Sequence, residues 1–400
     1  MATGGETELV RRGREGAVRS SFLELFLDLS YIVAFNQLSR RLAGNFTSNW
    51  WSVLQGMGET VLLLLALLMI WVYCTLITSR YEPRHPAVQL VIFGTMFASL
   101  VMAVSVPEAF GERGLAFAGA YVAILVGRPT VMVIALRGHQ RRVIAVKILL
   151  WAMASAVPWL AGALFLQGGG RALVWTLALA IDYLGFVLGW PTPRIGGGRI
   201  RTWEFTGRYM AERYQQLLII ALGEAILVLG LTSARKFGVD RAAAFVVSLA
   251  TTVLLWRIYF YRAGTVLAEA IESSSKPARL GRSVPYTHLV MATGVIMTGV
   301  GYELVIDHPL GHLNPGWLAA IFGGPVLFLA GRSVLEYEVF ARVSRSRIIG
   351  LFSLAALALA MVPLPPLAAA TSVTLVLTGV AVNDAIRASK APPEAPSPPR

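Results

Sequence analysis

Long apolar stretches recur along the chain and constrain its fold more than any other feature. A helix needs about 20 mainly apolar residues to cross the hydrocarbon core of a bilayer. Windows near that length predict twelve spans, so we expect an all-α, polytopic transmembrane helical bundle. The spans are expected at Phe22–Leu38, Val61–Thr78, Val88–Val106, Leu115–Leu136, Val143–Leu166, Leu173–Trp190, Leu217–Leu231, Ala242–Tyr261, Leu289–Val305, Trp317–Leu335, Ile348–Val362 and Val373–Ile386.

The composition supports a membrane protein and excludes several other classes. Of the residues, 56% are apolar and only 14% are charged, whereas a soluble domain carries about 25% charged residues. One cysteine, Cys74, excludes a disulfide framework, a thiolate zinc site and a four-thiolate iron–sulfur cluster. The first twenty residues have no apolar signal-peptide core, so the first span is expected to anchor the N-terminus.

The distribution of basic residues predicts the orientation. With a cytoplasmic N-terminus, the cytoplasmic segments hold 25 of the 35 Lys and Arg residues and the opposite loops hold 7. Short cytoplasmic loops are enriched in Lys and Arg, so both termini are expected on the cytoplasmic side of the membrane. The net charge of +13 then indicates attraction to anionic lipid headgroups rather than nucleic-acid binding.

The two halves of the chain resemble each other. Glu24, Asp28 and Asn36 of the first span have the same spacing as Glu212, Gln216 and Glu224 at the seventh. Four further pairs follow in the same order: Trp71–Tyr73 with Trp256–Tyr259, Arg128 with Arg332, Pro158 with Pro363, and Asp182 with Asp384. We therefore expect two parallel six-helix repeats related by an axis along the membrane normal.

This organisation predicts five segments. They are a basic cytoplasmic leader at 1–21, the first repeat at 22–190, a Pro-, Gly- and Arg-rich linker at 191–207, the second repeat at 208–386 and a disordered cytoplasmic tail at 387–400. More residues separate Glu212 from Arg332 in the second repeat than separate Glu24 from Arg128 in the first. A loop at Ala270–Arg282 is expected to supply the extra residues.

Charged side chains at bilayer depth are the first candidates for function because each costs at least about 2.5 to 3.5 kcal/mol to insert. Glu24 and Asp28 share one helix face and could share a proton or a cation, although arginines such as Arg19 could neutralise them. Glu224 ranks highest, because it lies near the bilayer middle and cannot reach water by snorkelling.

Two arginines complete the candidate substrate- or ion-binding set. Arg128 and Arg332 lie within spans, and symmetry suggests Glu24 or Asp28 as partners of the first and Glu212 or Glu224 as partners of the second. A structural brace and a substrate clamp are equally compatible with them. Asp182 has no obvious partner. The whole candidate set is Glu24, Asp28, Asn36, Gln37, Arg128, Glu212, Gln216, Glu224 and Arg332.

Neither a metal site nor a cofactor is predicted. The five histidines lie in loops or at a span border without ligand spacing on a shared helix. Lysine is nearly absent from the spans, which argues against a retinal Schiff base, and no phosphate-binding or nucleophile-elbow motif is present.

Two segments resemble the signatures of the bacterial low temperature requirement A (LtrA) family. They are Glu24-Leu-Phe-Leu-Asp28-Leu with Asn36-Gln37-Leu38, and Glu212-Arg213 followed by Ile219-Ile-Ala-Leu-Gly-Glu224. The resemblance covers about 13–386 and implies a multi-pass membrane protein without a settled molecular activity. Tyr209 stands where relatives often have His, which weakens any metal or proton-relay role for that position.

Three functions remain open. A proton- or cation-coupled secondary carrier for a small molecule or an ion is favoured, because parallel repeats with intramembrane carboxylates suit a central site. A membrane-embedded enzyme acting on a lipid or isoprenoid would use the carboxylates as acid and base, but a nucleophile is not evident. A non-catalytic membrane component supporting growth in the cold is the third. The oligomeric state is not readable from the sequence.

Overall fold

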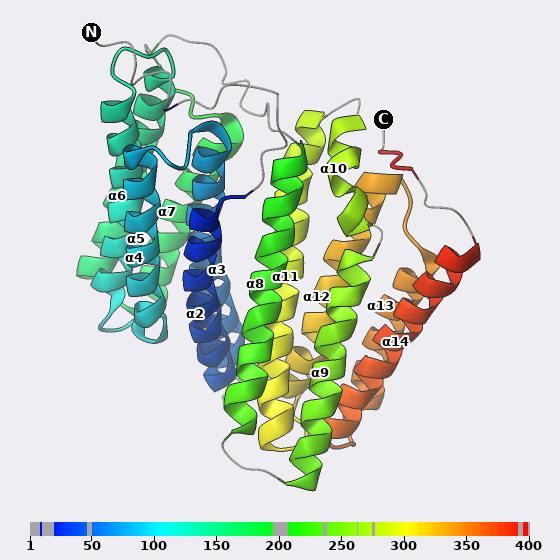
Figure 1. The fold of residues 1–400 in the computed structure, drawn as a ribbon. Helices are drawn as coiled ribbons and strands as arrows, with labels where there is room; N and C mark the ends of the chain where they lie inside the picture. The colour runs from blue at the N-terminus through cyan, green and yellow to red at the C-terminus, as the bar shows by residue number, and fades with distance from the viewer. Residues whose placement is uncertain are drawn as a thin grey trace. The chain divides into compact units, whose positions relative to one another are not determined.

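The computed structural model describes residues 9, 20–45, 50–193, 195, 207–234, 238–261, 263–273, 277–390 and 395–398. Within them the chain forms 13 α-helices and one short 3-10 helix. The chain divides into two compact units, which are residues 1–41 with 55–205, and residues 42–54 with 206–400 (Figure 1). Each unit is described by itself.

The first unit contains the helices from the first half of the chain, except for residues 42–54, which belong to the second unit. The helices are α2 (Phe22–Asn45), α3 (Trp50–Arg80), α4 (Pro86–Ser105), the 3-10 helix η1 (Val106–Glu108), α5 (Gly114–Ala135), α6 (Arg142–Phe165) and α7 (Gly168–Leu188). Residues 42–54 include the end of α2 and the start of α3. From α4 to α7, each helix packs on the next along the chain. On α3, the buried thiol of Cys74 lies 3.5 Å from Oγ1 of Thr95 on α4.

Aromatic side chains and one buried arginine join α5, α6 and α7. The rings of Trp159 and Trp175 have centroids 5.0 Å apart, and Phe117 stacks on Trp175 at 5.6 Å. Arg171 is 3% exposed and donates to five main-chain oxygens, those of Ala109, Gly111, Gly162, Ala163 and Leu166. Through these bonds Arg171 links the segment between η1 and α5 to the C-terminal end of α6.

The second unit contains the remaining helices. They are α8 (Gly207–Ser233), α9 (Val239–Phe260), α10 (Ala263–Ser273), α11 (Pro277–Asp307), α12 (Pro315–Phe340), α13 (Arg345–Ala360) and α14 (Pro366–Lys390). The helix α11 packs along both α8 and α12 (Figure 1). Gly294 and Gly324 bring the backbones of α11 and α12 together, since a Cβ on Gly294 would lie 2.7 Å from the main-chain oxygen of Gly324.

The expected helical bundle is confirmed. Each of the twelve predicted spans falls on one of the long helices, and in the described part of the chain 10 helices are long and apolar enough to cross a membrane. The two that fall short are α2, whose mean hydropathy is lowered by polar residues such as Glu24 and Asp28, and α13, which has 16 residues. That the two units are copies of one repeat stays a prediction.

The structure differs from the sequence-based expectations at two places. Most of the loop expected at 270–282 is helical, since α10 ends at Ser273 and α11 begins at Pro277. The helix α14 continues to Lys390, so residues 387–390 are not part of a disordered tail, and the amide of Ser397 donates to the main-chain oxygen of Val339. Most of the predicted linker at 191–207 and of the leader at 1–21 lies outside the described residues.

Candidate functional site

Glu24 lies in the first turn of α2 and takes part in its N-terminal cap. Its Oε2 accepts from the amide of Ser21 at 2.6 Å and from the Ser21 hydroxyl at 2.9 Å, and the Glu24 amide faces Oγ of Ser21 at 3.4 Å. This reciprocal arrangement is a capping box, in which a Ser and a Glu three residues later satisfy two otherwise unbonded amides. The spacing Ser-x-x-Glu is visible in the sequence, so this role of Glu24 could have been predicted.

We expect the variant Ser21→Ala to lower the free energy of unfolding by about 1 kcal/mol, which is the usual effect of removing an N-cap hydroxyl. The physical reason is that the Glu24 carboxylate loses the Ser21 hydroxyl as a donor, and the Glu24 amide keeps only the main-chain oxygen of Ser21 as an acceptor. Thermal unfolding in detergent micelles measures the change, with Ser21→Thr as the variant that keeps the hydroxyl. Equal midpoints for Ser21→Ala and the parent chain would contradict the capping role.

Asp28 is held by a neighbouring helix. It is 4% exposed, and its Oδ1 accepts from Nε1 of Trp71 on α3 at 3.1 Å. Further along α2, Asn36 is buried at 9% exposure and Gln37 is half-buried. The polar signature residues of this helix are therefore largely turned to the protein interior.

The second signature segment lies on α8. Glu212 and Gln216 are half-buried, whereas Arg213 is fully buried and donates from Nη1 to Oε1 of Gln216 at 2.7 Å. Arg213 is not in the candidate set predicted from the sequence. Its position inside the signature segment could have identified it as a site residue.

Glu224 is fully buried within α8, with 0% exposure of its side chain. Gly299 of α11 faces it, because a Cβ built on that glycine would lie 3.2 Å from Oε2 of Glu224. The helix α11 therefore approaches this carboxylate closely with a residue that has no side chain.

Arg128 on α5 does not have the carboxylate partner that symmetry suggested. Its guanidinium carbon lies 3.9 Å from the centre of the Tyr73 ring, and neither Nη1 nor Nη2 has a hydrogen-bond partner among the described residues. Glu24 and Asp28 are thus not its hydrogen-bonding partners. The nearby Asp182 on α7 accepts instead from the Tyr121 hydroxyl at 2.8 Å.

Asp182 has uncharged partners that charge-pair reasoning did not find. Besides Tyr121, Nε1 of Trp159 donates to its Oδ2 at 3.3 Å. These donors come from α5 and α6, so three helices of the first unit meet at this buried carboxylate.

Arg332 on α12 also differs from the expected pairing. Its Nε donates to the main-chain oxygen of Ile258 at 3.1 Å and its Nη2 to that of Tyr261 at 3.4 Å, rather than to Glu212 or Glu224. Both acceptors belong to the C-terminal end of α9, where helix carbonyl groups have no partner within the helix. The arginine therefore caps a neighbouring helix.

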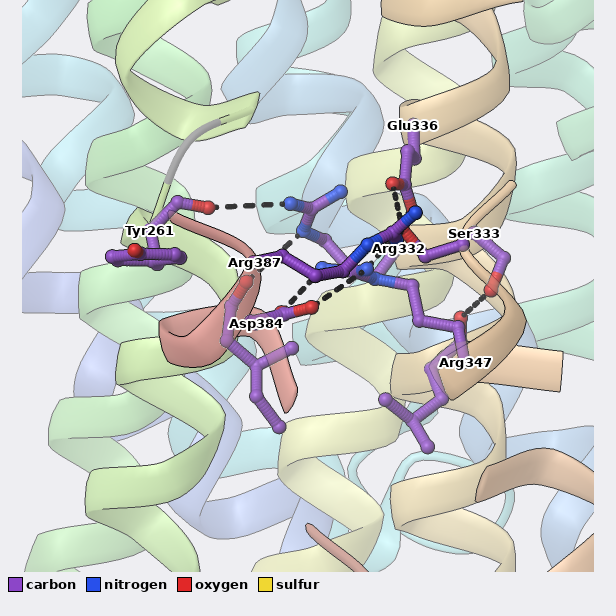
Figure 2. A network of polar contacts seen from close by, with 10 residues as sticks. Tyr261, Arg332, Ser333, Glu336, Arg347, Asp384 and Arg387 are labelled. Atoms are coloured by element: carbon purple, nitrogen blue, oxygen red, sulfur yellow. Dashed lines mark hydrogen bonds and ion pairs between the residues drawn. The ribbon is translucent and has the colours of Figure 1, made fainter. Parts of the chain in front are cut away.

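A network of charged side chains surrounds Arg332 at the ends of α12, α13 and α14 (Figure 2). Arg347 pairs with Oε2 of Glu336 at 3.0 Å and with Oδ2 of Asp384 at 2.9 Å. The hydroxyl of Ser344 donates to Oε1 of Glu336 at 2.6 Å. Together with Arg332 and Arg387 these residues line a cavity of about 20 Å³, which is room for about one water molecule.

His288 is buried inside α11 rather than at a span border. Its Nε2 lies 2.7 Å from the Tyr259 hydroxyl and its Nδ1 lies 2.8 Å from the main-chain oxygen of Val284. The described residues include no group of three His, Cys, Asp or Glu side chains that could hold a metal ion.

The sequence profile of the bacterial low temperature requirement A protein (LtrA) matches residues 19–382. The chain belongs to the LtrA family. The match begins just before the α2 signature and includes every described helix except the last turns of α14.

A relative of this LtrA protein occurs in Rhizobium meliloti (strain 1021). It is the uncharacterized protein RA0937, 34% identical over 333 residues, which cover 81% of this chain and 79% of the relative. No solved structure matches the chain. Membership of the LtrA family supports a multi-pass bacterial membrane protein, in agreement with the helices described above.

Proposed function

We propose that this LtrA protein is a proton- or cation-coupled secondary carrier of the bacterial inner membrane, with both termini in the cytoplasm. The observation that carries the proposal is the complete burial of the Glu224 carboxylate in the apolar part of α8. A carboxylate at that depth costs at least about 2.5 to 3.5 kcal/mol unless a proton, a cation or a basic side chain neutralises it. A group that binds a proton or cation inside the membrane is what ion coupling requires.

The surroundings of Glu224 support an ion site that can change its occupancy. Gly299 leaves the backbone of α11 close to Oε2, and the Tyr302 ring lies one turn further along the same helix, within electrostatic range of the carboxylate. Small residues at such contacts allow neighbouring helices to shift with little steric cost. The favoured substrate is a small molecule or an ion, and Arg213 with Gln216 on the same helix supplies further polar groups.

The test measures ion binding directly, because it does not require the transported molecule to be known. Proteoliposomes on a solid-supported membrane are exposed to a jump in pH or in the concentration of Na⁺ or K⁺. Binding of an ion inside the membrane displaces charge, so the parent protein should give a transient current. We expect Glu224→Gln to reduce that current by at least about tenfold, since the amide cannot take up the ion.

The matched control is Glu112→Gln, which makes the same change at an exposed glutamate between η1 and α5. That variant should keep the full current, and size-exclusion chromatography checks that both variants fold. A Glu224→Gln current equal to that of the parent protein would overturn the proposal, as would the absence of any current in the parent protein.

A further inference from the structure

The first unit contains a cavity that neither the carrier proposal nor the signature segments use. It has a volume of about 50 Å³ and lies between the C-terminal parts of α3 and α5 and the start of α6. Two arginines line it, and none of its described lining residues is acidic. The others are apolar or aromatic and include Leu76, Ile77, Met132, Ile148 and Trp190.

Arg128 presents an unsatisfied guanidinium to this cavity. The side chain is 5% exposed, and both terminal amino groups are buried without a hydrogen-bond acceptor in the described part of the chain. The Tyr73 ring covers one face of the guanidinium plane, with 3.9 Å between the guanidinium carbon and the ring centre. The edge of the guanidinium that carries the N–H donors is left open to a ligand. A buried polar group without a partner costs free energy, and a bound oxyanion would recover this cost.

The second unit provides an internal comparison. Arg332, the counterpart of Arg128 in the predicted repeat, bonds to two main-chain oxygens and lies beside Glu336, four residues later on α12. Four residues after Arg128 the chain has Met132, which lines the cavity of the first unit. At this position the acidic residue of the second unit is thus replaced by an apolar residue in the first unit. The acidic side chain near Arg128 is Asp182 on α7, whose Oδ2 accepts from Tyr121 and Trp159 instead.

We propose that the cavity around Arg128 binds the headgroup of an amphiphilic anion, with a carboxylate or phosphate on Arg128. A volume of about 50 Å³ holds such a headgroup but not a long chain, so the apolar chain begins against Leu76, Ile77 and Met132 and continues outside the cavity. The two free amino groups suit bidentate binding of an oxyanion. The apolar lining favours a hydrocarbon chain over a small inorganic ion. Such a headgroup could come from a free carboxylic acid or from an anionic lipid, and both have the same chemistry at Arg128.

The test compares two probes with purified protein in phosphatidylcholine nanodiscs. Decanoate is titrated as the free acid, and phosphatidylglycerol is incorporated as the lipid, while the fluorescence of Trp190 and the other tryptophans reports binding. Decanol and acetate are matched probes that lack the charge and the chain, respectively. We expect decanoate or phosphatidylglycerol to bind at least about tenfold more tightly than either matched probe, because both the charged hydrogen bonds and the apolar contacts contribute.

The decisive variant is Met132→Glu, which places a carboxylate where the second unit has one. We expect it to weaken binding of the anionic probe by about tenfold or more, because the new side chain occupies Arg128. Met132→Leu, which keeps an apolar side chain, should bind like the parent protein. Arg128→Lys keeps the charge but loses the bidentate geometry, so this variant should also bind the anionic probe more weakly. It replaces Met132→Glu as the test variant if Met132→Glu does not fold.

Each outcome decides the proposal. Decanoate binding that Met132→Glu abolishes supports a free-acid ligand, and phosphatidylglycerol binding with the same sensitivity supports a lipid. If neither probe binds the parent protein, or if both Met132→Glu and Arg128→Lys bind as well as the parent, the proposal is wrong. The site does not depend on Glu224, so Glu224→Gln should leave this binding unchanged even if the ion-coupled carrier proposal fails.

Discussion

Replacing Asp384 by alanine is expected to lower the free energy of unfolding by about 3 to 5 kcal/mol, the usual effect of removing one partner of a buried ion pair. Asp384 is 8% exposed and Arg347 is 3% exposed, so water does not replace the missing carboxylate. The variant leaves Arg347 with Glu336 alone while Arg332 and Arg387 remain in the same network. Thermal unfolding in detergent micelles, or titration with a denaturing detergent, measures the loss.

The matched variant removes both partners. In Arg347→Met combined with Asp384→Leu, this ion pair is removed as a whole, while Glu336 keeps the hydroxyl of Ser344 and the nearby Arg332. Buried pairs replaced by apolar residues are often neutral in stability. We therefore expect the double variant to be more stable than Asp384→Ala. If Asp384→Ala unfolds at the same temperature as the parent protein, the network in Figure 2 does not contribute to stability as described.

The second large effect is expected at the contact of α11 with α12. The variant Gly294→Ala should cost about 3 kcal/mol, since overpacking a tight contact forces the backbone to shift. The added Cβ would lie 2.6 Å from the amide nitrogen of Phe328 and 2.7 Å from the main-chain oxygen of Gly324. These are backbone atoms of the facing helix, so no flexible side chain can move aside.

Gly379→Ala on α14 is the control for this prediction. A Cβ at that glycine meets nothing within 4 Å, and alanine is the better helix former, so the control should be neutral or slightly stabilising. Unfolding in detergent distinguishes the two variants. Similar stability of both would show that the two helices are not held at the distance the structure gives.

The positions of the long helices could be predicted because the bilayer imposes a minimum apolar length on each of them. The helix α10 could not be predicted in that way. It has only 11 residues, AGTVLAEAIES, with apolar and polar residues on different faces. A window of membrane-spanning length averages such a short amphipathic helix with its polar neighbours, so the loop expected at 270–282 includes the C-terminal end of α10.

The charged residues of interest can be found in the sequence by their charge, but their partners cannot. Arg332 uses main-chain oxygens at the end of α9, and Asp182 uses the hydroxyl of Tyr121 and the indole of Trp159. A search that pairs opposite charges cannot see such neutral partners, because tertiary packing decides which of them come within reach. The role of Glu24 in a capping box is different, because its signal is local and stands in the sequence.

The burial of Cys74 has a practical use. Its side chain is 2% exposed and lies against Thr95, so a membrane-impermeant maleimide should react with it slowly. New thiols can therefore be introduced one at a time into the natural background, without first removing the native one. Labelling of intact cells and of inverted vesicles would then map which loops face the periplasm.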